Sequence, residues 1–341
     1  MIRLSSLRPG LFRRIAACVT LMLSASAPIR AEPFTTITMI AASPAGGTYD
    51  ATARLLARHL GKTLPGAPRI IVQNMPAAGG LVALNQLYNQ SPRDGSVLAV
   101  VDGALIFEAL FGNSAVRFDP KQFNWIGSRA KETPLCAARS DKSIGTIEEA
   151  MRKETIVGGV GGARTDNVPR MLNAIIGTKF KVVTGYPGSS ELIGALERGE
   201  IDAICGWSWT TIKRRVPHWL RENKIDLLVQ TGFAKAPDLP QVPLALDLVR
   251  ADADRSIMRF LISDVLIASP LLAPPGLPAS RVVELRDAFD TAMRDPQLLA
   301  DAQQQQIDID PTGGAEIQAI VSSMFSLPRD LALVAKNMIG R

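Results

Sequence analysis

The sequence predicts an α/β protein made of two similarly built domains. Apolar runs typical of buried strands alternate with segments of helical period over residues 36–101, and the alternation resumes between about 130 and 230. In each half, a glycine-rich loop joins such a strand to the helix that follows it. This alternation favours parallel sheets with right-handed crossovers, and the near-continuous apolar strands indicate sheets that are covered on both faces.

The first half has the pattern strand–helix–strand–helix–strand. Its first helix carries one apolar face and is expected to end at Gly61. The region from Asp102 to Ser128 is predicted to be irregular. The expected strands are 36–42, 69–73 and 97–101, and the expected helices are 49–60 and about 81–89.

The stretch from Ser43 to Asp50 joins the first strand to the first helix and is a candidate ligand loop. Gly46 and Gly47 let the backbone approach a ligand closely, and Thr48 is the expected N-cap. The unpaired N–H groups and the dipole of a helix start together bind anions. The alternative is an ordinary tight turn, since the lysine of a P-loop and the three-glycine dinucleotide pattern are both missing.

The second half repeats this arrangement. A strand over 155–158 leads into the glycine loop 158–162, and a helix with one apolar face then runs to a stop at Gly177. Later glycine turns again follow strands and precede helices, as expected for ligand loops at strand carboxyl ends. The remaining expected features are strands over 180–184, 201–205 and 225–230, a turn at 185–188 and a helix from about 189 to Gly199.

The last third is predicted to be mostly helical. A proline-rich connection spans 236–243, a second proline motif at 272–278 introduces a helix, and the final helix starts near Gly314. This part is too short for a third domain, so we expect it to pack back on the first one. Two or more crossovers then join the two domains.

The N-terminus has the form of a secretory signal. A basic segment ends at Arg14, an apolar segment runs from Ile15 to about Ala27, and we place the cut after Ala31. The five arginines of this leader carry most of the net charge of +6, and their removal leaves 33 Lys and Arg against 32 Asp and Glu. The mature protein is therefore nearly neutral, which argues against a nucleic-acid partner. We expect an exported protein with no membrane span.

Cysteine and histidine give no sign of a metal or cofactor site. Cys136 and Cys205 remain after the leader; export allows their oxidation, but two cysteines define no disulfide framework, and we favour a buried core thiol for Cys205. His59 and His218 lie far apart, and no Cys/His/Asp group has metal spacing. With no nucleophile elbow either, the sequence predicts no enzyme, no metal and no cofactor.

Several motifs, in order, resemble those of the exported substrate-binding proteins of tripartite tricarboxylate transporters, the Bug family. No single motif is decisive, but the ordered set covers nearly the whole mature chain. Ala77 departs from the usual glycine of the second motif. The similar stretches are 44–50, 73–80, 92–95, 184–191, 198–202, 206–209 and 273–278.

The resemblance implies a type II periplasmic binding protein: two Rossmann-like α/β lobes that close by a hinge motion over a ligand cleft. It divides the chain into a signal peptide over 1–31, lobe 1 over 32–129 plus 248–341, and lobe 2 over 130–247. It further implies a periplasmic, monomeric receptor that gives a small carboxylate to membrane permease subunits. An exported ligand sensor and an uncharacterised exported enzyme are the alternatives.

The loops that face the implied cleft supply the predicted site residues. Asp102 and Gly103 belong to this set because they follow the third strand directly. The predicted ligand-binding residues are Ala45, Gly46, Gly47, Thr48, Asp50, Asp102, Gly103, Gly161, Gly162, Ala163, Arg164, Thr165, Tyr186, Pro187, Gly188 and Asp202.

Ala163 and Arg164 depart from the family pattern. Ala163 stands where relatives commonly have a small hydroxyl, and a guanidinium follows it. One hypothesis is that Arg164 faces the cleft and strengthens anion binding by a bidentate contact; the alternative is that it points into solvent.

Five other side chains are each given more than one role. We favour a structural role for Asp50 within its own loop, and a position facing the cleft for Tyr186. We keep two alternatives for Asp202: its side chain reaches the cleft, or it is exposed at the start of a strand. Trp207 and Trp209 line the pocket or pack the hinge; because they follow a buried strand, we favour a place in the core.

Overall fold

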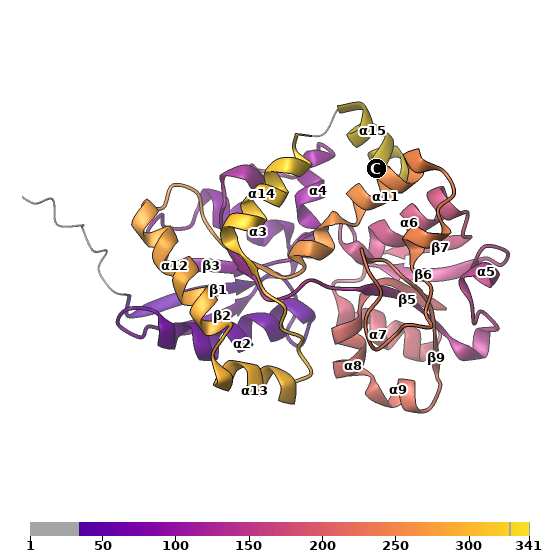
Figure 1. The fold of residues 1–341 in the computed structure, drawn as a ribbon, viewed down its shortest axis with the longest axis horizontal. Coiled ribbons are helices and arrows are strands. Elements are labelled where there is room, and N and C mark those ends of the chain that lie inside the picture. The colour runs from indigo at the N-terminus through magenta and orange to yellow at the C-terminus, as the bar shows by residue number, and fades with distance from the viewer. Residues whose placement is uncertain (1–33, 327–328, 341) are drawn as a thin grey trace, which may run out of the picture. The chain divides into compact units, whose positions relative to one another are not determined.

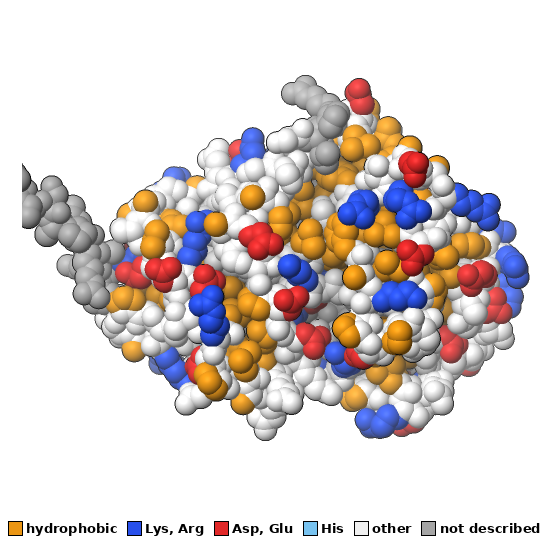
Figure 2. All heavy atoms as spheres, viewed as in Figure 1, with side chains coloured by type: hydrophobic (Ala, Val, Ile, Leu, Met, Phe, Trp, Pro, Cys, Tyr) orange, Lys and Arg blue, Asp and Glu red, His pale blue; other side chains and the backbone are white. Residues whose placement is uncertain are grey.

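The computed structural model describes residues 34–326 and 329–340. The predicted signal peptide and its cut after Ala31 lie outside these residues. Within the described part of the chain, none of the helices combines the length and the apolar character needed to cross a membrane. Figure 2 shows Lys and Arg side chains interspersed with Asp and Glu on the face drawn, as the nearly neutral composition leads one to expect.

The first sheet has six strands in the order β11-β4-β10-β3-β1-β2. Strand β1 pairs in parallel with β2 and β3, whereas β10 and β11 pair in antiparallel fashion. The expectation of an irregular region up to Ser128 is wrong, because it contains a helix and the strand β4. The strands are β1 (Thr36–Ala41), β2 (Arg69–Asn74), β3 (Val97–Val100), β4 (Asn124–Ser128), β10 (Pro270–Ala273) and β11 (Thr312–Gly313).

The second sheet has five strands in the order β7-β6-β8-β5-β9. Strand β6 is parallel to β7 and β8, and β5 runs antiparallel between β8 and β9. The two sheets therefore share a parallel centre with added antiparallel strands. The strands are β5 (Pro134–Arg139), β6 (Thr155–Gly159), β7 (Phe180–Thr184), β8 (Ala203–Ser208) and β9 (Ile225–Gln230).

Helices cover both sheets (Figure 1). Those beside the first sheet or between the sheets are α2 (Thr48–Thr63), α3 (Leu81–Asn89), α4 (Leu105–Leu110), α11 (Asp252–Leu261), α12 (Ala279–Ala292), α13 (Pro296–Gln304), α14 (Gly314–Met324) and α15 (Arg329–Met338). Those of the second sheet are α5 (Ile147–Ala150), α6 (Arg164–Ile176), α7 (Ser189–Arg198), α8 (Trp209–Arg215), α9 (Pro217–Arg221) and α10 (Ala245–Leu248). Short 3-10 helices are η1 (Ala77–Gly80), η2 (Pro120–Gln122), η3 (Ser140–Lys142) and η4 (Ser263–Ile267).

Both predicted ends of α2 are wrong. The N-cap is Gly47, and Thr48 is already the first helical residue. The helix also continues through Gly61, where an added Cβ would lie 2.4 Å from the carbonyl oxygen of Pro68. Gly61 is therefore needed for close packing rather than for ending the helix. By contrast, Gly177 and Gly199 do end their helices, both in the left-handed conformation.

The C-terminal third packs on both halves of the molecule. Helices α12 and α13 contact α2, and α14 contacts β4, as the expected return to the first domain requires. Helices α11 and α15, however, contact α6 of the second half (Figure 1). Their apolar residues, among them Met258 and Ala335, belong to one buried cluster with Leu172 of α6. The last third thus joins the two halves as well as completing the first.

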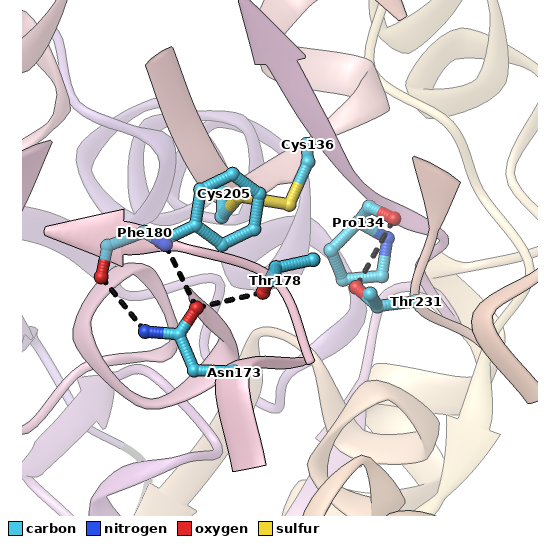
Figure 3. The surroundings of a disulfide bond; sticks show 7 residues. All are labelled: Pro134, Cys136, Asn173, Thr178, Phe180, Cys205 and Thr231. Atoms are coloured by element: carbon cyan, nitrogen blue, oxygen red, sulfur yellow. Dashed lines mark hydrogen bonds between the residues drawn. A yellow bond between two sulfur atoms is a disulfide. The ribbon is translucent and has the colours of Figure 1, made fainter. Parts of the chain in front are cut away.

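A disulfide links the two remaining cysteines, so the interpretation of Cys205 as a core thiol is wrong. Cys136 lies on β5 and Cys205 on β8, and both side chains are fully buried. Figure 3 shows the Phe180 ring beside the bond and Asn173 bonded to both backbone groups of Phe180. The pairing was not visible in the sequence because it depends on β5 inserting next to β8, across a separation of 69 residues.

We predict that the disulfide stabilises the second half of the molecule. Replacing both cysteines, Cys136→Ala with Cys205→Ala, should lower the free energy of unfolding by about 2–4 kcal/mol, because the bond closes a long loop in the unfolded chain. Urea unfolding measures this. Dithiothreitol should destabilise the wild type and leave the double variant unchanged. Equal midpoints for the wild type and the variant would contradict the prediction.

Candidate functional site

Three helix starts meet at one small cavity between the two sheets. The first residues of α2, α6 and α7 all line it, together with Asp102, which lies just after β3, and the last residues of β8. The cavity has a volume of about 80 Å³, which suits a small molecule or a few waters. Its lining residues are Ala42, Ser43, Thr48, Tyr49, Gly79, Asp102, Glu132, Val160, Ala163, Arg164, Thr165, Pro187, Gly188, Ser189, Leu192, Gly206, Trp207 and Ser208.

The loop before α2 is held in place by Asp50. Its carboxylate accepts hydrogen bonds from the backbone N–H of Gly46 and from Nδ2 of Asn74, both at 2.8 Å, and pairs with Arg54 at 2.9 Å. Burial acts to raise the pKa of Asp50, but these hydrogen bonds and the Arg54 charge outweigh it, so the pKa lies below its ordinary value. Asp50 thus fixes the loop from within, and it does not line the cavity.

The loop before α6 is fixed in the same way by side chains of its own helix. The hydroxyl of Thr165 accepts from the N–H of Val160 at 2.9 Å, and Asp166 accepts from the N–H of Gly162 at 3.3 Å. Asn167 donates to the carbonyl of Gly162 at 3.2 Å. These hydrogen bonds occupy part of the loop's backbone N–H and C=O groups with side chains of the helix that follows. From this loop and the start of α6, the cavity is lined by Val160, Ala163, Arg164 and Thr165, and by none of the loop's glycines.

The two halves touch directly beside the cavity. The hydroxyls of Thr48 on α2 and Thr211 on α8 lie 2.6 Å apart, and Arg215 donates to the carbonyl of Gly46 at 2.9 Å. Gly188, at the start of α7, lies so close to Pro44 that an added Cβ would be 2.9 Å from the proline ring. The first glycine loop is thus in contact with the second half of the molecule.

Arg164 lies at the wall of the cavity, and its alternative placement in solvent is wrong. Arg164 is only 5 % exposed. Its guanidinium contacts Asp264 at 2.7 Å through Nε and Glu132 at 3.1 Å through Nη1, and Nη2 lies 3.8 Å from Asp102. Burial opposes its charge, but the three carboxylates outweigh burial and hold the pKa of Arg164 well above its ordinary value. The side chain is therefore cationic at any physiological pH.

One of these carboxylates, Glu132, connects Arg164 to a second buried arginine. Glu132 lies between the two guanidinium groups and accepts from Nη2 of Arg129 at 2.7 Å. Arg129 is 1 % exposed and also donates to the hydroxyl of Thr52 at 2.9 Å. Burial raises the pKa of Asp264 above its usual range. Glu132, Arg129 and Asp264 were missed in the sequence because nothing in their local pattern distinguishes buried charges from exposed ones.

Tyr49 adds a neutral phenol to this wall. Its hydroxyl is hydrogen-bonded to Asp102, and burial, followed by the charge of Asp102, raises its pKa well above 10.0. The side chain therefore stays protonated. Asp102 also accepts from the N–H of Ala104 at 3.0 Å, which fixes the carboxylate at the carboxyl end of β3.

Three polar atoms of the cavity wall have no hydrogen-bond partner among the described residues. They are Nη2 of Arg164, Nε1 of Trp207 and Oγ of Ser208, and each belongs to a side chain that is more than nine-tenths buried. Trp207 therefore lines the cavity in addition to being buried, which goes beyond the predicted core role. Buried N–H donors without partners are costly, so a bound molecule that accepts from them gains affinity.

The structure brings part of the predicted site set together at this cavity. Those that line it are Thr48, Asp102, Ala163, Arg164, Thr165, Pro187 and Gly188; those that do not are Ala45, Gly46, Gly47, Asp50, Gly103, Gly161, Gly162, Tyr186 and Asp202. Gly161 and Gly162 line a separate, open groove with Arg170. Asp202 accepts from the N–H of Ile156 at 3.0 Å and pairs with Lys142 at 3.1 Å, which gives it a structural contact.

The role of Asp50 gives a pH-dependent prediction. Because its folded pKa is lowered, its stabilisation is present above the unfolded value near 3.8 and is lost as the pH falls below it. Asp50→Asn should therefore lower the free energy of unfolding by about 1–3 kcal/mol at pH 7, and the difference should shrink between about pH 5 and pH 3. Denaturant titrations across this range measure it. Asp287→Asn, at an exposed position on α12, is the control and should change little.

Comparison with known proteins finds UPF0065 proteins as sequence relatives. No family profile matches the chain. A UPF0065 protein of Agrobacterium vitis is 26 % identical over 274 residues, which are 78 % of this chain and 74 % of the relative. A UPF0065 protein of Cupriavidus necator is 27 % identical over 299 residues, which are 83 % of each chain.

Solved structures with the same fold are periplasmic binding proteins. The periplasmic binding protein BugD superposes with a TM-score of 0.72 at 21 % identity, over 90 % of this chain and 98 % of that one. MatC of Rhodopseudomonas palustris, solved with bound malate, superposes with a TM-score of 0.70 at 20 % identity, over 90 % of this chain and the whole of the other. The predicted resemblance is thereby confirmed: this chain is a homologue of the UPF0065 proteins and has the two-sheet α/β fold of the Bug-type and TctC-type periplasmic binding proteins.

Proposed function

We propose that this protein is a periplasmic receptor that captures a small carboxylate between two lobes and delivers it to a tripartite tricarboxylate-type membrane transporter. The observation that carries the proposal is the convergence of three helix N-termini on one cavity. Helix starts offer unpaired backbone N–H groups and a positive dipole end, and both favour an anion. Three such starts around one cavity suit a carboxylate group.

The proposed lobes follow the two sheets. Lobe 1 comprises 32–129 plus 248–341 and lobe 2 comprises 130–247, and every strand of each sheet falls within one of these ranges. The cavity has walls from both ranges, so a ligand that contacts both lobes stabilises the closed arrangement. Backbone donors that the surrounding bonds already hold in place need little ordering on binding, which favours affinity.

The transport role rests on the relatives and on the leader. MatC was solved with malate, a small carboxylate. A signal peptide over 1–31 would export the chain to the periplasm, where it would act as a monomer and meet the permease subunits. The receptor releases its ligand unchanged, so the proposal involves no turnover, no cofactor and no metal.

The proposal predicts ligand-dependent thermal stability. A specific carboxylate should raise the melting temperature in proportion to the logarithm of its excess over Kd, and a hundredfold excess corresponds to about 2.7 kcal/mol. Differential scanning fluorimetry of the purified protein against mono-, di- and tricarboxylates measures this. Stabilisation by amines or sugars but by no acid would overturn the carboxylate assignment, and turnover of the bound molecule would favour an enzyme.

Gly188 offers a test of closure. An added methyl group would meet the ring of Pro44, which belongs to the other proposed lobe, at 2.9 Å. Gly188→Ala should therefore weaken carboxylate binding at least about tenfold while both lobes stay folded, because the closed arrangement loses its close fit. Gly313→Ala is the matched control, since an added Cβ there meets no atom within 4 Å. Unchanged affinity in Gly188→Ala would contradict closure at this contact.

A further inference from the structure

We propose that the ligand is a small monocarboxylate that carries an uncharged hydrogen-bond acceptor, such as a ketone or hydroxyl oxygen, and that Trp207, Ser208 and the Nη2 group of Arg164 recognise this acceptor. This inference rests on the proposed function, because it takes the carboxylate at the helix starts as given. It concerns the other end of the ligand and assigns its chemical class.

The charges around the cavity disfavour a second carboxylate. Arg164 already contacts Asp264 and Glu132, and Asp102 lies 3.8 Å from its Nη2 group. Together with Arg129, these groups make three carboxylates against two guanidinium groups, all deeply buried. Arg164 is thus neutralised by the protein itself. A further anion at this wall would meet the carboxylates of Asp102 and Glu132, which line the cavity, at short range in a poorly screened site.

The unpaired groups disfavour an ammonium. Both N–H groups that lack a partner, Nη2 of Arg164 and Nε1 of Trp207, can only donate. Both oxygens of Glu132 are engaged, one by Arg129 and one by Arg164. An ammonium would bring further donors to Nη2 of Arg164 and Nε1 of Trp207, whereas a ketone or hydroxyl oxygen accepts from them. Oγ of Ser208 can donate to the same oxygen.

These side-chain donors come from other parts of the chain than most of the helix starts of the carboxylate subsite. Trp207 and Ser208 are the last two residues of β8, whereas the helix starts that line the cavity belong to α2, α6 and α7. Arg164, the first residue of α6, lies against the end of β8. Gly206 allows this approach: its φ is +65°, and an added Cβ would lie 2.6 Å from the carbonyl oxygen of Arg164. One end of a short acid can therefore meet backbone donors while its chain oxygen meets the side-chain donors.

Two matched series of acids test the class of ligand by isothermal titration calorimetry. The three-carbon series is propionate, pyruvate, malonate and alanine, and the five-carbon series is pentanoate, 4-oxopentanoate, glutarate and 5-aminopentanoate. In the series that fits the cavity, the keto acid should bind about 3- to 10-fold more tightly than the plain acid, as expected for a hydrogen bond to a neutral acceptor. The affinity for the keto acid should also exceed the affinity for the diacid by at least about tenfold.

Variants that remove single donors test the assigned residues. Trp207→Phe deletes the indole N–H and keeps an aromatic ring, and it should abolish the preference for the keto acid, so that the keto acid and the plain acid bind equally tightly. Ser208→Ala provides the same test without changing a large buried side chain. Trp209→Phe is the matched control, because its Nε1 donates to Asp238 at 2.8 Å and the residue does not line the cavity.

The outcomes distinguish this inference from the function on which it rests. If the diacid or the amino acid binds most tightly, the receptor proposal stands and the inference is overturned. The inference is likewise overturned, and the receptor proposal stands, if Trp207→Phe and Ser208→Ala leave the keto-acid preference intact. It is also overturned if both variants weaken the binding of plain and keto acids equally. If no acid of either series and no larger carboxylate binds, the receptor proposal itself fails, and the inference fails with it.

Discussion

The buried guanidinium of Arg164 is the interaction on which the rest of the site depends. It starts α6 of the second half and contacts carboxylates from three different places: the end of β3, the segment between β4 and β5, and η4. A buried charge is tolerated only when it is paired, and a missing partner would leave an uncompensated charge in the interior. This constraint fixes the start of α6 against the first half of the molecule.

The other helix starts are arranged around that fixed point. Asp50 and Asn74 hold the loop before α2 from within, and the hydroxyl pair of Thr48 and Thr211 brings that loop against α8. These hydrogen bonds hold the start of α2 in place through groups of the protein itself. A site of this kind recognises an anion mainly through backbone groups, so it leaves the side chains of the wall free to select among acids.

The side chains of the cavity wall combine a cationic arginine with carboxylates that pair with it. A cationic residue in a binding cavity would ordinarily suggest a receptor for anions, and Arg164 does line the cavity. Its charge is nevertheless met by the protein's own carboxylates, so its remaining N–H acts as a hydrogen-bond donor rather than as a free positive charge. The indole N–H of Trp207 has the same property, and the two donors together give the cavity a preference that its net charge does not reveal.

The sequence by itself determined the α/β class, the strand–loop–helix units and the helix starts near Thr48, Arg164 and Ser189, because periodicity and glycine punctuation are local properties. Only the tertiary structure decided which of those starts share a cavity, that Arg164 is buried among Asp102, Glu132 and Asp264, and that Cys136 meets Cys205. These features join residues separated by tens to more than a hundred positions. Their partners are chosen by strand order and packing, which no local pattern records.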